Sequence, residues 1–207
     1  MKSIPMEPEL QALIDEYHRV GGVIEYRMFE LEQGDIACEQ LFRQAAIETV
    51  RMACPSGKHD LTLANSITGK IESGHTFLGP YWSGTRKTLL VHGQSPNLNY
   101  FFYANDEEKR ETAIDLAHWV EASGYAYAFS EPPYKLQCPN KRKSELFVRI
   151  NNGLVPFGMD ATGTIIYSWP TNWSSYFDAG REWWGEYLWT VWYPGRRVLG
   201  ITASTTD

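Results

Sequence analysis

Near its C-terminus the chain contains two strand-like segments that constrain the fold more than any other feature of the sequence. Residues 186–193 (EYLWTVWY) and 196–203 (RRVLGITA) are rich in β-branched and aromatic residues, and Pro194-Gly195 lies between them. Proline fixes φ at the first central position of a type II turn and glycine supplies the positive φ at the second, so the pattern predicts a β-hairpin. Both alternating sets of side chains on 186–193 are apolar, which predicts a strand inside the sheet.

Three other segments have helical patterns. Apolar residues at helical spacing predict helices over about residues 10–20 and 35–53, the second capped by Asp35. Asn105, with a glutamate three residues further on, is a variant of the capping box and predicts a third helix that ends at Gly124.

Most of the remaining chain has strand-like patterns. Residues 61–71 alternate between apolar and polar side chains, which is typical of an antiparallel strand with one wet face. Further strands are expected at 22–31, 86–92, 99–104 and 125–130 and, after an exposed loop over 131–144, from residue 145 onward. The sequence therefore predicts one α+β domain over residues 1–207, with a largely antiparallel sheet of about eight strands, about three helices and a C-terminal β-hairpin.

Charge and cysteine content narrow the classes of function. The net charge of −6 disfavours nucleic acids and anionic membranes as partners, and it suits solubility or a basic protein partner. Three widely spaced cysteines indicate free thiols rather than a disulfide framework. Because no signal peptide and no membrane-spanning apolar stretch are found, a cytoplasmic location is expected.

Catalytic motifs are scarce. The chain has no GxGxxG and no P-loop, and its five histidines show no metal-ligand spacing, so neither a cofactor nor a metal is expected. His75 and His92 lie in a loop and at a strand end, where functional residues concentrate, and they are the candidates for general acid–base work. The alternative is that both are hydrogen-bonded structural histidines.

Two aromatic segments are candidates for binding. The loop over residues 79–87 combines Tyr81, Trp82 and Arg86, which could frame an anionic or ring-shaped ligand or simply fold onto the core. The C-terminal aromatics allow three interpretations, namely core, protein interface or a platform that stacks on sugars or bases. The residues that lie off the predicted strands and fit an interface are Trp173, Arg181, Trp183 and Trp184.

Three functions follow from these patterns. The first is a non-catalytic binding protein that engages a protein partner. The second is a small enzyme whose pocket is lined by histidine, arginine and tryptophan, and the third is a carbohydrate or small-ligand binder that uses exposed tryptophans. In size, acidity, aromatic content and lack of catalytic motifs the chain resembles bacterial immunity and inhibitor proteins, which neutralise a toxin by binding to it. This resemblance is compositional and assigns no residue a role.

Overall fold

The structure is a computed structural model that describes residues 1–92, 100–106, 114–115, 122–154, 164–193 and 197–205. The described residues have the predicted α+β fold, with seven α-helices instead of about three, and ten strands that pair antiparallel in two sheets. The chain divides into two compact units, one comprising Met1–Gln11, Val23–Gly74 and Gly158–Asp207 (unit 1), the other Ala12–Gly22 and His75–Phe157 (unit 2). This division does not test the expectation of a single domain over residues 1–207, which stays a prediction.

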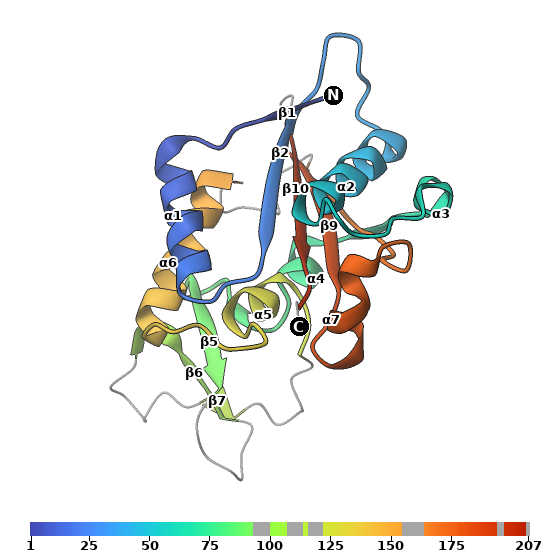
Figure 1. Ribbon diagram of the computed structural model, residues 1–207. Helices are drawn as coiled ribbons and strands as arrows, with labels where there is room; N and C mark the ends of the chain where they lie inside the picture. Colours follow the sequence, from blue (N-terminus) through green and yellow to red (C-terminus); the bar gives the residue numbers. More distant parts are fainter. Residues whose placement is uncertain (93–99, 107–113, 116–121, 155–163, 194–196, 206–207) are drawn as a thin grey trace. The chain divides into compact units, whose positions relative to one another are not determined.

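Unit 1 is built on a six-stranded antiparallel sheet (Figure 1). Its order is β1 (Lys2–Ile4), β2 (Glu25–Glu30), β10 (Arg197–Ala203), β9 (Tyr187–Tyr193), β8 (Ile165–Ser168) and β3 (Lys70–Glu72).

The predicted C-terminal hairpin is present in this sheet. β9 pairs with β10 in a register that places Trp192 opposite Val198 and Trp189 opposite Ile201. β9 lies between β10 and β8, which confirms that it is inside the sheet. The predicted turn at Pro194-Gly195 lies outside the described residues.

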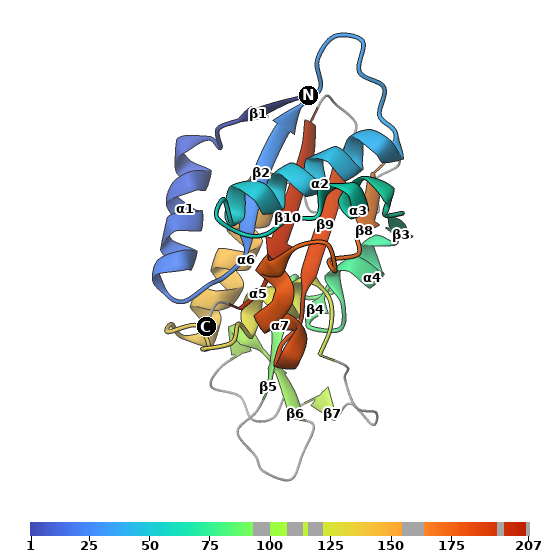
Figure 2. The same cartoon turned by 45° about the vertical axis from the view of Figure 1, so that its right-hand side comes forward.

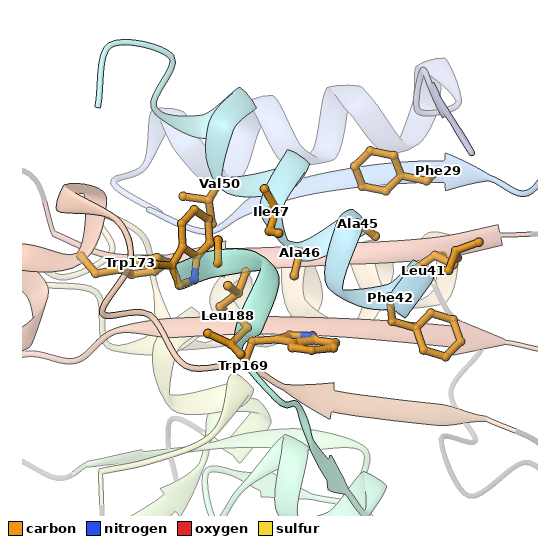
Figure 3. Packing of buried hydrophobic residues seen from close by; sticks show 14 of the residues in the cluster. Phe29, Leu41, Phe42, Ala45, Ala46, Ile47, Val50, Trp169, Trp173 and Leu188 are labelled. Carbon is orange, nitrogen blue, oxygen red and sulfur yellow. The ribbon is translucent and has the colours of Figure 1, made fainter. Parts of the chain in front are cut away.

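One helix covers a face of this sheet. The helix α2 (Glu39–Ala53) crosses β2, β10 and β9 (Figure 2). Its apolar residues recur at helical spacing and pack with aromatic side chains into one core (Figure 3), which contains Leu41, Phe42, Ala45, Ala46, Ile47, Val50, Phe29, Trp169, Trp173, Phe177, Leu188 and Val198. The helix can approach closely because β10 has a glycine, Gly200, where it faces Thr49.

The expected N-cap of α2 is wrong. The helix begins at Glu39 and its N-cap is Cys38, which makes no side-chain cap hydrogen bond. Asp35 instead accepts the backbone N–H of Glu32 at 2.8 Å and lies 3.0 Å from the N-terminal amino group. Its carboxylate closes a turn before the helix, because short acidic side chains bond to nearby backbone N–H groups in turns as readily as at caps.

The strand expected over 61–71 is also wrong for most of its length. Leu61–Ser66 form the helix α3, and only Lys70–Glu72 belong to a strand, β3, which pairs with β8. Asp60 begins the helix by accepting the backbone N–H of Leu63 at 2.9 Å. The local N-cap at Asp60 therefore overrides the alternating pattern over Leu61–Ser66.

Unit 2 has a four-stranded antiparallel sheet of β4 (Trp82–Ser83), β5 (Thr88–His92), β6 (Tyr100–Tyr103) and β7 (Ile114–Asp115). The predicted first helix is confirmed as α1 (Pro8–Arg19), and the boundary between the units falls within it. The other helical segments from this part of the chain are α4 (Gly74–Leu78), the 3-10 helix η1 (Ala104–Asp106), α5 (Tyr125–Ser130) and α6 (Asn140–Leu154).

Three expectations fail in unit 2. The helix expected from Asn105 to Gly124 is wrong at Ile114–Asp115, which pair with β6, whereas Ala104–Asp106 form η1. The rest of its predicted length, 107–113 and 116–121, lies outside the described residues. The segment 125–130, expected as a strand, is the helix α5. The strand expected directly after residue 145 is wrong, because Asn140–Leu154 form α6, which also shortens the loop expected over 131–144. Farther along, β8, β9 and β10 are strands, as expected.

Aromatic packing explains why α5 and α6 are helical. Tyr125 and Phe129, one helical turn apart, are both buried, and each ring contacts Phe147 of α6 with centroids 5.3 and 5.0 Å apart. Tyr17 of α1 stacks on Phe129 at 4.2 Å and donates its hydroxyl to the carbonyl oxygen of Phe129. Tertiary burial therefore overrides the strand preference of these aromatic residues.

The contact between α2 and β10 can be tested at Gly200. A Cβ atom there would collide with Oγ1 of Thr49, so we expect Gly200→Ala to lower the free energy of unfolding by about 1–3 kcal/mol in urea titrations. In a Thr49→Ala background the same substitution should cost less, because the colliding atom is gone. An equal cost in both backgrounds would contradict this account of the packing.

A second test concerns the backbone crossing at Gly124, the N-cap of α5. Gly124 has φ +85°, and a Cβ there would lie 2.7 Å from Cα of Gly79. Gly34 has φ +100° but an open surrounding, so Gly34→Ala isolates the backbone strain, about 1–2 kcal/mol. We expect Gly124→Ala to cost at least about 1 kcal/mol more than Gly34→Ala in chemical denaturation. Equal losses would show that the crossing adjusts without penalty.

Candidate functional site

The short helix α7 (Asp178–Trp183) of unit 1 carries the most distinctive exposed side chains of the C-terminal aromatic segment. It continues directly from the 3-10 helix η3 (Ser175–Phe177). Ser174 caps η3 by accepting the backbone N–H of Tyr176 at 3.2 Å, and Phe177 is fully buried in the core of unit 1. The start of α7 is therefore anchored by core packing.

The end of α7 is held by two glycines. The carbonyl oxygen of Gly180 accepts the N–H of Trp184 at 3.1 Å and that of Gly185 at 2.7 Å. Gly185 has φ +142°, which side chains rarely adopt. A Cβ on Gly180 would lie 2.6 Å from Oγ of Ser204, so glycine lets α7 lie directly against the C-terminal segment. Both contacts limit how α7 can move.

The two tryptophans at the end of α7 have opposite environments. Trp183 is 54% exposed, whereas Trp184 is 8% exposed and packs edge-on against Tyr187 with ring centroids 5.2 Å apart. Consecutive residues of a helix point about 100° apart, so only one of the two indoles can face the core. At the end of α7 the fold thus presents one of the two indoles to solvent.

Charged side chains accompany Trp183. Arg181 donates from Nε to Oε2 of Glu186 at 2.9 Å and from NH1 to Oδ1 of Asp178 at 3.5 Å. Glu182 is exposed next to Trp183. We call Asp178, Arg181, Glu182, Trp183 and Glu186 together the α7 surface. The pairing of Arg181 with Asp178 follows from their spacing of three along a helix, but Glu186 lies beyond the helix end and was not predictable from spacing.

Tyr176 ties the approach to α7 to the last strand of the sheet. Its hydroxyl hydrogen-bonds with the side chain of Thr202 and the backbone of Ser204. Burial, with a smaller effect from the carboxylate of Glu25, raises the pKa of Tyr176 well above the ordinary tyrosine value. The neutral hydroxyl is therefore the form that the folded protein stabilises.

The other predicted tryptophans of the C-terminal aromatic segment are buried, unlike Trp183. Trp173 is buried in the core and donates its indole N–H to the carbonyl oxygen of Pro170 at 2.9 Å (Figure 3). Because Trp173 and Trp184 are both buried, neither of these two side chains is available to a partner. Among the three tryptophans predicted from residues 173–184, Trp183 alone is exposed.

In unit 2 the loop over residues 79–87 is partly folded onto its own unit. Tyr81 is buried, with its ring 5.3 Å from Phe101, and Trp82 packs on Phe147 at 5.2 Å. Arg86 is exposed and lies over the ring of Tyr103, 4.5 Å from its centroid. Tyr81 and Trp82 therefore have packing roles, and of the three predicted binding residues in this loop Arg86 is the exposed one.

The proposed acid–base pair stays a prediction. His75 is exposed on α4. His92 ends β5, and its side chain lies outside the described part of the structure.

A third histidine, His59, lines an open pocket in unit 1. The pocket measures about 430 Å³ and is formed with Glu48, Arg51, Met52 and Pro55. Nε2 of His59 donates to the carbonyl oxygen of Cys54 at 3.0 Å, and Nδ1 lies 2.9 Å from Oγ of Ser174. Both ring nitrogens of His59 are thus engaged within the fold.

Among the described residues, no group of three or more histidine, cysteine, aspartate or glutamate side chains could hold a metal ion. No helix in the same ranges combines the length and apolar character that crossing a bilayer requires.

Comparison of the chain with protein-family models, with curated proteins and with solved structures gave no match.

The anchoring role of Tyr176 predicts a pH dependence. Because its pKa is raised in the folded state, the stability it contributes is fully present below the pKa of the unfolded chain, about 10, and is lost as the pH rises above it. Tyr176→Phe should be less stable than the wild type at pH 8, since it loses two hydrogen bonds. It should, however, lose less of its remaining stability between pH 8 and pH 11. Urea unfolding of both proteins at pH 8 and pH 11 measures the free energy of unfolding. An identical fall in the wild type and in Tyr176→Phe would contradict this role of Tyr176.

Proposed function

We propose that this chain is a non-catalytic binding protein that engages a protein partner through the α7 surface. The observation that carries the proposal is the exposure of Trp183, 54%, on a helix whose two ends are held by core packing and by close backbone contacts. Tryptophan and arginine are the side chains most enriched at the energetic centres of protein interfaces. A rigid exposed indole also loses little conformational entropy on binding.

The other two functions have less support. A sugar-binding platform needs a row of solvent-facing aromatic rings, and burial removes Trp173 and Trp184 from such a row. An enzyme needs an acid–base pair in a cleft, and the His59 pocket offers a histidine whose ring nitrogens are both engaged. Partner binding is therefore the function with the most support among the three.

A narrower form of the proposal is that the chain acts as an immunity or inhibitor protein. Its net charge of −6 and its acidic α7 surface are compatible with covering a basic site on another protein. The narrower form depends on the identity of the partner.

The proposal can be tested by affinity capture with the full chain as bait. Wild type, Trp183→Ala and Tyr134→Ala are immobilised and exposed to an extract of the source cells. Tyr134 is a suitable control because its ring is also exposed, at 64%, but belongs to unit 2. A specific partner should be retained by the wild type and by the control and should be depleted on Trp183→Ala.

The captured partner, once purified, allows the effect to be measured. If Trp183 is a binding centre, its removal should raise Kd roughly thirtyfold, corresponding to about 2 kcal/mol. Equal retention of the same proteins by all three baits, or retention of none, would contradict the proposal.

A further inference from the structure

The charges around Trp183 indicate which kind of partner the α7 surface fits. Over residues 178–186 there are three carboxylates and one guanidinium, a formal charge of −2. The guanidinium of Arg181 is already held by Asp178 and Glu186 at 3.5 and 2.9 Å, so its charge is compensated within the surface. An approaching anion would meet net negative charge and would have to displace an existing ion pair.

The exposed indole adds a specific preference for cations. The face of an indole ring is electron-rich and attracts ammonium and guanidinium groups within about 6 Å, more strongly than the rings of tyrosine or phenylalanine do. Glu182, which is exposed and precedes Trp183 in the sequence, adds a carboxylate to the same exposed end of α7. The net charge of −6 on the whole chain would also steer a basic partner towards the surface.

We infer that the partner of the α7 surface is a basic protein that places an arginine or lysine side chain on the indole of Trp183, with Glu182 as its counter-ion. This inference rests on the proposed function and adds the chemistry of the partner. The ion pairs of Arg181 hold Asp178 and Glu186 in place. The formal charge of −2 makes the surface negative before the partner arrives. Guanidinium is the better fit, because it stacks on an aromatic face and bonds to a carboxylate at the same time.

The test uses the full chain with ¹⁵N-labelled indoles and short peptide probes. Octa-arginine, octa-lysine and octa-glutamate are titrated in turn, and the indole N–H signal of Trp183 is assigned from its loss in Trp183→Phe. We expect this signal to shift with both basic peptides, at lower concentration with octa-arginine, and not with octa-glutamate. Raising the salt concentration should weaken the effect.

Two charge variants separate local recognition from overall charge. Glu182→Gln should weaken octa-arginine binding about two- to fivefold, the contribution expected of an exposed cation site. Glu9→Gln removes one negative charge from an exposed position in α1 and should leave the titration of Trp183 unchanged. Equal weakening by both variants, or a shift with octa-glutamate as large as with octa-arginine, would overturn the inference.

The two proposals fail in different ways. Capture of a neutral or acidic partner that depends on Trp183 would leave partner binding intact and refute the basic partner. If no captured protein depends on Trp183, the proposed function itself fails, whatever the peptides show.

Discussion

The close approach of α2 to β10 at Gly200 is the contact on which unit 1 depends. Because β10 has no side chain opposite Thr49, the helix can lie directly on the β9–β10 hairpin. The helix and the sheet then enclose a core that includes three large aromatic residues from the segment before β9, Trp169, Trp173 and Phe177. Phe177 leads directly into α7, so the same packing that stabilises the sheet also sets the position of the exposed Trp183.

The α7 surface combines features that are costly to expose and features that are favourable in water. Trp183, at 54% exposure, buries less apolar area than its neighbour Trp184, which is 8% exposed. Around Trp183 lie three carboxylates and Arg181, which give the segment a net negative charge. This arrangement resembles the apolar anchor and polar rim of the binding centre that we propose.

Sequence-based prediction succeeded for some elements of the fold and failed for others, including several long patterns. The hairpin, α1 and most of α2 were predictable, because their apolar periodicity extends over seven or more residues. The helices α3 and α5 have six residues each, and strands were indicated instead, by alternation of apolar and polar residues for α3 and by aromatic content for α5. Over so short a length periodicity cannot separate the two, and the cap at Asp60 and the ring contacts of Tyr125 with Phe147 decided the outcome.

The sequence by itself determined an acidic α+β chain with an interior C-terminal strand, because composition and a sustained two-sided apolar pattern are local properties. It also narrowed the candidate interface to residues 173–184. Only the tertiary structure decided that Trp183 is exposed while Trp173 and Trp184 are buried. That choice depends on contacts between segments distant along the chain, such as Gly180 with Ser204 and Tyr176 with Thr202, and no pattern within one segment encodes such contacts.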